Sequence, residues 1–288
     1  MSERLSFWVL PAITTFGLLL LLVLERKRPL RREVESKPRR VIRNLTTGGI
    51  AFAVVTLVQT PLLLPVARWV TENDFGLLNL LGLSGWLKTL FAVLLLDYTL
   101  WHWHWINHKV PFFWRFHLVH HVDLDLDAST ALRFHFGEFL LSVGYRIVQV
   151  VAIGADIFSV TVWQAFLVAS ILFHHSNTRL PARVERLLVR LIVTPRMHGI
   201  HHSTRVNETN SNWSSLLSVW DYLHRTAVLN VPQQEVVIGV PAYQEKESVT
   251  LGKILTLPFL KQREDWRGAN GKLVERAHDP DKEAELRA

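Results

Sequence analysis

The sequence predicts an all-α integral membrane protein of about four to five transmembrane helices, with a cytoplasmic helical cap that carries histidine clusters. First, the 288-residue chain is 49% hydrophobic and its apolar residues come in long uncharged blocks, which is typical of membrane-spanning helices. Second, nine Lys or Arg residues within 25–43 lie between two such blocks, as expected for a cytoplasmic loop. Third, most of the fourteen histidines fall into clusters with helical spacing.

The composition narrows the possible partners and cofactors. The formal charge is +7 and the pI is about 9.9, but the positive charge lies beside apolar blocks. Anionic lipid headgroups therefore explain it better than nucleic acid, for which no binding motif is present. The chain has no cysteine, which excludes disulfides, thiolate metal sites and iron–sulfur clusters. Any metal must be held by His, Asp, Glu or backbone atoms, and any electrons must come from another protein.

The N-terminal region, residues 1–84, is predicted to hold two spans around the basic loop. Residues 7–24 carry no charge; a signal peptide is the alternative, but the positive charges follow the apolar block instead of preceding it. Residues 45–67 form the second predicted span, which we expect to be kinked or to end near Pro61 and Pro65. The positive-inside rule then places the N-terminus outside.

The central region, residues 85–228, is predicted to be the catalytic domain. It begins with a third span over 86–106, followed by a short helix over 112–122 and then irregular chain. Residues 139–153 and 157–173 predict a helical hairpin. Residues 182–193 place apolar and arginine side chains on opposite faces, which indicates a helix on the membrane surface, although a soluble surface helix fits that window equally well. Residues 229–288 are predicted to be a polar cytoplasmic tail.

Three clusters of histidines predict a metal site. His104 and His108 are four residues apart, and the sets 117/120/121 and 198/201/202 repeat a spacing of three and one. Residues at these spacings share one face of a helix, so each cluster can aim several imidazoles at one point. Burial of so many unpartnered rings would be costly, whereas a metal accepts the lone pair of each. Two metals that share eight to ten ligands are the natural count.

The remaining histidines receive other predictions. His102 points away from His104 on a helix and is left out of the ligand set. His224 and His278 are isolated and are predicted to lie on the surface. His174 and His175 are adjacent, so we expect only one to be a ligand, and His135 stays open between a ligand, an orienting and a structural role.

These motifs resemble the fatty acid hydroxylase/sterol desaturase superfamily of membrane di-iron enzymes. HWINH, HLVHH and HGIHH match its HxxxH, HxxHH and HxxHH pattern, and PFFWRFHLVHH and STALRFHFGE match the surroundings. The resemblance covers roughly residues 85–225. The sequence departs from the family at Phe136, where proline is usual, and at Trp213 and Ser214, where tyrosine and glycine are usual.

The resemblance implies two iron ions held almost entirely by histidine. The ligands carried over by motif position are His104, His108, His117, His120, His121, His175, His198, His201 and His202. Four further residues are candidates to orient the ligand rings: Asp97, His135, His174 and Asn177. Asp97 would serve equally well to cap or end a helix. Glu138 and Arg133 are expected to pair structurally, and no catalytic residue is expected apart from the ligands.

The implied function is O2-dependent hydroxylation, or desaturation, at a C–H bond of a lipid or sterol-like substrate. The electrons would come from a separate protein of the ferredoxin or cytochrome b5 type. Two alternatives stay open, an ether-lipid cleaving monooxygenase of the same family and a non-redox metal-binding membrane protein. The expected location is the bacterial inner membrane, with the active site and the C-terminus in the cytoplasm.

Overall fold

The computed structural model describes residues 2–268 and 270–274, and within them it is helical, with isolated β-bridges in place of any strand. His278 and the charged residues 279–288 of the predicted tail lie outside the described residues. In the described part, four helical segments are long and apolar enough to cross a membrane: Val9–Lys27, Lys37–Leu80, Phe136–Ile153 and Ile157–His175. The predicted fold class, an all-α integral membrane protein, is confirmed.

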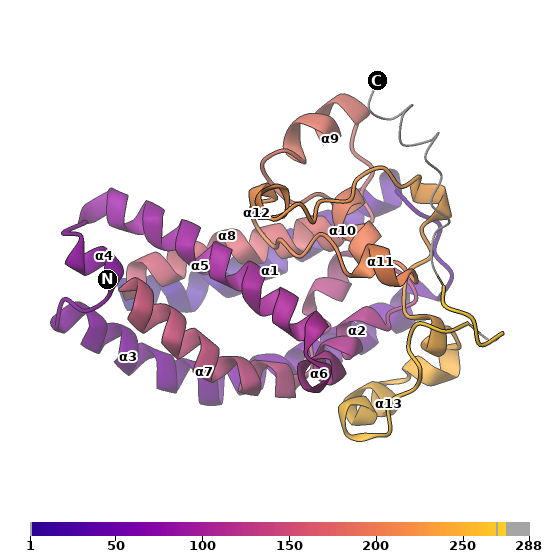
Figure 1. Ribbon diagram of the computed structural model, residues 1–288, viewed down its shortest axis with the longest axis horizontal. Coiled ribbons are helices and arrows are strands. Elements are labelled where there is room, and N and C mark those ends of the chain that lie inside the picture. Colours follow the sequence, from indigo (N-terminus) through magenta and orange to yellow (C-terminus); the bar gives the residue numbers. More distant parts are fainter. Residues whose placement is uncertain (1, 269, 275–288) are drawn as a thin grey trace.

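Long helices run side by side along the longest axis of the molecule (Figure 1). Helix α1 packs on α8, α5 packs on α8, and α3 packs on α7. The bounds are α1 Ser2–Lys27, α2 Lys37–Val54, η1 Val55–Gln59, α3 Thr60–Glu72, α4 Leu77–Leu80, α5 Gly85–Lys109, α7 Phe136–Ile153 and α8 Ile157–His175.

Large apolar side chains cover the outside of this bundle. Phe16 on α1 is 71% exposed, Leu57 in η1 is 74% exposed and Phe166 on α8 is 57% exposed. In water such a surface would favour association or aggregation, whereas lipid tails solvate it at no cost. The exposed apolar surface therefore fits a chain that lies in a bilayer.

The second predicted span neither ends nor breaks at its prolines. Instead α2 runs into a π-helical turn, η1, and α3 begins at Thr60 directly before Pro61. Proline lacks an N–H donor and its ring displaces the preceding turn, so a local change of helical register accommodates it. The predicted irregularity is present, but it lies just before Pro61.

The predicted third span over 86–106 forms as helix α5, and its crossing of a membrane stays a prediction. The helix forms over Gly85–Lys109, yet it is not among the segments apolar enough to cross a membrane by composition. Lys88, Asp97 and several histidines lower its hydropathy, and Asp97 is buried inside the protein. Helix α5 thus turns Asp97 and His104 to the interior and exposes apolar residues such as Trp86 and Phe91 on its outer face.

Short helices form a cap at one end of the bundle, on the right in Figure 1. The amphipathic helix predicted over 182–193 is shorter, since α9 ends at Leu188. Leu187 is 70% exposed, so the apolar face expected at a membrane surface is present. The bounds are α6 Pro111–His121, η2 Ala128–Leu132, α9 Ala182–Leu188, α10 Pro195–His201, α11 Val206–Thr209, α12 Val219–Leu223, η3 Gln233–Glu235, η4 Pro241–Tyr243, η5 Lys246–Val249, α13 Leu251–Thr256 and η6 Leu257–Phe259.

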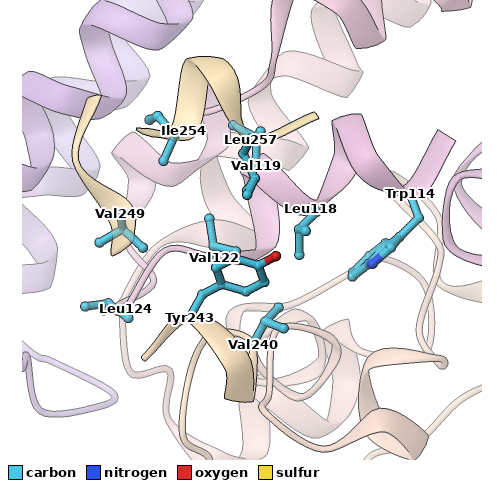
Figure 2. Close-up of a cluster of buried hydrophobic side chains, with 10 residues drawn as sticks. All are labelled: Trp114, Leu118, Val119, Val122, Leu124, Val240, Tyr243, Val249, Ile254 and Leu257. Atoms are coloured by element: carbon cyan, nitrogen blue, oxygen red, sulfur yellow. The ribbon is translucent and has the colours of Figure 1, made fainter. Parts of the chain in front are cut away.

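The described part of the predicted C-terminal tail is folded onto α6, which corrects the expectation of a loose polar tail there. Val240, Tyr243, Val249, Ile254 and Leu257 are buried against α6 and the residues after it (Figure 2). This segment is polar on average, but its apolar residues lie in or beside short 3₁₀ and α turns and all pack against α6 and the residues after it. This layer holds α6, and with it three of the clustered histidines, from outside.

The basic loop between α1 and α2 lies at the capped end. Pro29 forms an isolated bridge with Thr178, and the backbone N–H of Leu30 donates to the carbonyl of Asn177 at 2.8 Å. Arg31 donates to Gln233 Oε1 at 2.6 Å. The most basic segment of the sequence therefore meets the segment that follows α8 and the short helix η3.

Candidate metal centre

The histidine clusters meet where the bundle joins the cap. Helix α5 supplies one pair, α6 supplies a set of three, the end of α8 supplies His175, and α10 with the residue after it supplies the last three. The structure sorts these side chains into two groups in which the ligand atoms lie within 4.8 Å of one another. The five-histidine group comprises His104, His108, His117, His121 and His201, and the four-histidine group comprises His120, His175, His198 and His202.

The two groups divide the α6 cluster between them. His117 and His121, four residues apart, face the first group, and His120 faces the second. The spacing was expected to aim each cluster at one point, but the structure divides both three-histidine clusters: the i and i+4 residues share a group, whereas i+3 is turned to the other. All the predicted ligands are thus brought together, and metal binding by them stays a prediction.

Backbone carbonyls fix the tautomers in the five-histidine group. His104 Nδ1 lies 2.7 Å from the carbonyl oxygen of Trp213, and His201 Nδ1 lies 2.7 Å from that of Ser211. A carbonyl only accepts hydrogen bonds, so Nδ1 carries the proton in both rings and Nε2 carries a lone pair. The two Nε2 atoms are 3.1 Å apart, so two lone pairs face each other with no proton between them.

The four-histidine group repeats this arrangement. His120 Nδ1 donates to the carbonyl of Arg133 at 3.2 Å, and His175 Nδ1 donates to that of Ile171 at 2.7 Å. Their Nε2 atoms are 3.0 Å apart, and His198 Nε2 lies 3.0 Å from that of His175. Neutral rings held in this way repel one another unless a cation accepts the lone pairs.

The donor set fits a metal ion at each group. Nitrogen ligands bind at about 2.0–2.1 Å, so two of them at a right angle would be about 3.0 Å apart. The Nε2 atoms of His108 and His121 are buried and have no hydrogen-bond partner among the described residues. Imidazole suits zinc, copper, iron and nickel, so these residues leave the choice among such metals open.

Burial keeps these imidazoles neutral. Burial lowers the pKa of His201 to about 3, despite the hydrogen bond to the Ser211 carbonyl. Burial, followed by the charges of neighbouring imidazoles, lowers the pKa of four others well below the usual value: His120, His121, His198 and His202. The neutral ring is the form that binds metals, so the group is ready for a cation at neutral pH.

Glu138, at the start of α7, contacts a ligand candidate, which corrects the predicted Glu138–Arg133 pair. Its Oε1 lies 3.1 Å from His117 Nδ1, while Arg133 binds Asp123 and the carbonyl of Val119. A carboxylate behind a ligand imidazole fixes its tautomer and raises its basicity. The only signal in the sequence was an acidic residue in the first turn of an apolar helix.

Two of the residues predicted to orient the rings do not contact any ligand candidate. Asp97 accepts hydrogen bonds from Trp220 Nε1 at 2.7 Å and from the backbone N–H of Leu217 at 3.1 Å. Asn177 Oδ1 accepts from the backbone N–H of Arg31 at 2.8 Å. Asp97 thus links α5 to α12, and Asn177 links the end of α8 to the basic loop.

The two histidine candidates for the orienting role differ. His135 caps α7: its Nδ1 accepts from the backbone N–H of Gly137 at 3.0 Å, and its Nε2 lies 3.1 Å from the Leu255 carbonyl. These bonds make it structural. The His174 ring centroid lies 4.6 Å from that of His175 and 4.1 Å from that of His198. His174 therefore packs against two ligand candidates, as a ring-positioning residue would.

His102 and His224 lie together away from both groups. The His102 ring meets that of Trp101 edge-on, and His224 stacks on Trp101 with centroids 4.1 Å apart. His102 is outside the ligand groups, as expected. His224 was expected on the surface but is half-buried, since the indole covers one face of its ring.

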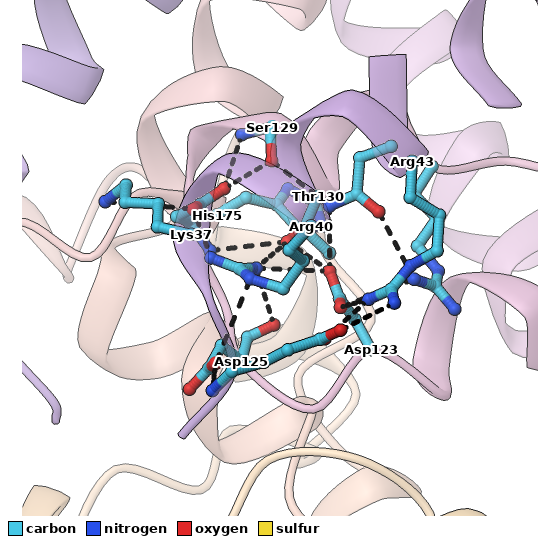
Figure 3. A network of polar contacts seen from close by, with 12 residues as sticks. Lys37, Arg40, Arg43, Asp123, Asp125, Ser129, Thr130 and His175 are labelled. Carbon is cyan, nitrogen blue, oxygen red and sulfur yellow. Dashed lines mark hydrogen bonds and ion pairs between the residues drawn. The ribbon is translucent and has the colours of Figure 1, made fainter. Parts of the chain in front are cut away.

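A buried ion-pair network holds the segment that follows the α6 cluster (Figure 3). Asp123 accepts from Arg40 at 3.2 Å and from Arg133 at 3.3 Å, and Arg40 also bonds Asp127. Burial alone would raise the pKa of Asp123, but the opposing charges of Arg133 and Arg40 outweigh it and lower the pKa to about 2. The network ties α2 to the residues directly after His121.

An apolar cavity of about 490 Å³ opens beside both groups. His117 and His120 contribute to one end of its wall, and Phe134, which stacks on His120 with centroids 4.2 Å apart, lines it there. Most of the rest of the wall comes from α5 and from α1, α2, η1, α7 and α8, which belong to the membrane-crossing segments. An apolar molecule in the bilayer could therefore reach the histidines without passing through water.

Comparison with known proteins agrees with this geometry. The family model described as fatty acid hydroxylase matches residues 89–226. Ornithine lipid hydroxylase OlsE of Rhizobium tropici is 27% identical over 190 residues, 62% of this chain and 53% of that protein. Alkylglycerol monooxygenase of Xenopus tropicalis is 27% identical over 166 residues, 58% of this chain and 35% of that protein.

The matches thus span about half of the first relative and about a third of the second. No solved structure matches the chain. The histidine clusters, the helices that carry them and the cavity between them all lie largely within the matched segment. Residues 89–226 therefore resemble a fatty acid hydroxylase domain, and the family model and both relatives support the relationship to the fatty acid hydroxylase superfamily that the motifs predict.

Proposed function

We propose that the chain is a membrane-bound non-haem di-iron oxygenase that hydroxylates a C–H bond of a lipid. One observation carries the proposal: two groups of buried histidines, each with converging Nε2 lone pairs, border an apolar cavity between membrane-crossing helices. The activities of the two relatives, a lipid hydroxylase and a monooxygenase, support the reaction class. The reaction would convert C–H and O2, with two electrons and two protons, to an alcohol and water.

In this proposal each group holds one iron ion, and the ions supply the binding and reduction of O2. The five-histidine and four-histidine sets would be the two ligand spheres. The backbone carbonyls and Glu138 keep Nδ1 protonated and Nε2 directed inward in five of the rings: His104, His117, His120, His175 and His201. The cavity wall excludes water and holds the alkyl chain against the histidine groups, so positioning is the main contribution of the protein.

The position of the basic loop supports a cytoplasmic site. The loop carries the positive charge that the positive-inside rule places in the cytoplasm, and Arg31 bonds the segments around α10. A location in the bacterial inner membrane, a separate electron donor of the ferredoxin or cytochrome b5 type, and a cytoplasmic C-terminus complete the proposal. The similarity to alkylglycerol monooxygenase favours ether-lipid cleavage as the second candidate.

The test combines metal counting with O2 uptake. The protein is purified in detergent without O2, its metals are counted, and O2 consumption is measured with a reductase system and mixed bacterial lipids. About two irons per chain and lipid-dependent uptake are expected. His120→Ala should lose the iron of the four-histidine group and the uptake, whereas His102→Ala, a matched change outside both groups, should keep two irons and the uptake. Two tightly held zinc ions after iron-replete expression, with no uptake from any donor, would refute the proposal.

A further inference from the structure

The cavity has a polar end away from the histidines. Gln59, Ser142, Arg146 and Gln164 all line it, and Gln59 Nε2 donates to Ser142 Oγ at 3.3 Å. These residues come from three different helical segments, η1, α7 and α8, which meet in the middle of the membrane-crossing part. A cavity that holds only hydrocarbon needs no such group of donors, since apolar walls suffice.

Arg146 lies on the same face of α7 as Glu138. The two residues are eight positions apart with Ser142 between them, and all three line the cavity. Eight residues correspond to a rise of about 12 Å along a helix. Glu138 contacts the ligand candidate His117, so α7 marks out a path from the histidine groups to an arginine deep in the bundle.

The guanidinium of Arg146 has no anionic group in direct contact. Its Nε forms no hydrogen bond, and no ion pair joins it to any residue in the described part of the chain. Glu138, the acidic residue among the described lining residues, contacts His117 through Oε1 and acts on Arg146 only as a charge at a distance. The guanidinium carbon of Arg146 lies over the Trp163 ring, 5.4 Å from its centroid. This contact stabilises the cation but leaves the N–H donors of Arg146 unused.

A charge without a partner inside a membrane span requires an explanation. Arginine does not deprotonate in proteins, and such residues in spans almost always pair with another group or face a functional cavity. The planar guanidinium matches an oxyacid group, to which it can donate two parallel hydrogen bonds. The neighbours Gln59, Ser142 and Gln164 are neutral, so Arg146 would balance a single negative charge on a bound group.

We propose that Arg146 binds a monoanionic oxyacid group of the lipid substrate, either a carboxylate or a phosphodiester, and so sets which carbon reaches the histidine groups. The substrate would be an acidic lipid whose charged group and oxidised carbon lie at opposite ends of the cavity. The proposal rests on the proposed oxygenase function for the reaction, but the binding step can be measured without it.

The test uses full-length, iron-loaded protein in nanodiscs of zwitterionic lipid. Three radiolabelled probes share one saturated chain: hexadecanoate, its methyl ester and hexadecyl methyl phosphate, at a pH where the carboxylate is ionised. Wild-type protein should bind at least one of the two anions more than about tenfold tighter than the ester, which corresponds to about 1.4 kcal/mol. The anion that binds identifies the acidic group.

The variants isolate the arginine. Arg146→Gln should lose the preference for the anion and leave the affinity for the ester unchanged, while Arg146→Lys should keep part of the preference. Arg190→Gln, an equal change of charge at an exposed position after α9, should change neither affinity. Equal binding of ester and anions by wild-type protein overturns the proposal even if a variant fails to fold, and so does an unchanged preference in Arg146→Gln.

Oxygen uptake on the same samples separates this inference from the proposed function. Binding selective for an anion, without uptake from any donor, would support the role of Arg146 and refute the oxygenase. Equal oxidation of acid and ester, unaffected by Arg146→Gln, would refute the role of Arg146 and leave the oxygenase intact.

Discussion

Glu138 offers the sharpest test of the two-group arrangement, because it contacts one group alone. Its Oε1 lies 3.1 Å from Nδ1 of His117, a member of the five-histidine group. Glu138→Gln keeps an oxygen that can accept the His117 proton but removes the charge. Glu138→Ala removes the acceptor and leaves a buried N–H without a partner. Both variants should therefore weaken one metal and spare the other.

The expected size follows from the contact. Loss of a partner behind a metal ligand costs about 10–100-fold in metal affinity, or about 1.4–2.7 kcal/mol. For Glu138→Gln the loss of metal affinity should be near the lower value, because a hydrogen bond to a neutral acceptor is about half as strong as one to a charged acceptor. Glu138→Ala should fall near the upper value, since an unsatisfied buried donor costs about 1–3 kcal/mol.

The assay is stepwise chelation of the iron-loaded protein, with the metal left on each chain counted by mass spectrometry. One metal should leave at lower chelator concentration in both variants, and the second should leave where it does in wild-type protein. Glu247→Gln, at an exposed position in η5, serves as the control. An equal shift for both metals, or no shift in Glu138→Ala, would contradict the division into two groups.

Three further predictions concern stability. Asp123→Ala leaves the buried guanidinium of Arg133 without an acidic partner and removes one of the partners of Arg40. It should cost about 3–5 kcal/mol, measured by thermal unfolding against Glu33→Ala as a more exposed control; a change as small as that of the control would refute the network. Ile254→Ala leaves a cavity at a fully buried position in the layer on α6 and should lower the free energy of unfolding by about 2–5 kcal/mol. Leu260→Ala, at an exposed position, should change it by no more than about 0.5 kcal/mol. Equal losses in the two variants would show that the layer is not packed. Chelation of both metals should lower Tm, because the facing Nε2 lone pairs then lack a cation, and an unchanged Tm would argue against metal at these groups.

The sequence was informative where a single segment carries the whole signal. Apolar blocks predicted α7 and α8 within a few residues, and Pro111 with the spacing of the histidines predicted α6. These features depend on neighbours along the chain, which sequence patterns record directly.

Features that depend on distant partners could not be predicted. Asp97 looked suited to orient a ligand, but Trp220, more than a hundred residues later, takes its carboxylate. Glu138 was expected beside Arg133, although Asp123 binds that arginine and leaves the carboxylate to His117. The layer that contains Tyr243 and Ile254 was not predicted, because its turns are too short to show a periodic pattern of apolar residues.

The ligand rings take their orientation largely from the main chain. The carbonyls of Trp213, Ser211, Arg133 and Ile171 accept the Nδ1 protons of four ligand candidates. A carbonyl is supplied by any residue type, so substitution at these positions leaves the acceptor in place as long as the backbone keeps its course. Trp213, which stands where the family usually has tyrosine, illustrates this tolerance. The backbone path that orients these rings can therefore be kept while the side chains along it change, and a comparison of residue types would not reveal it.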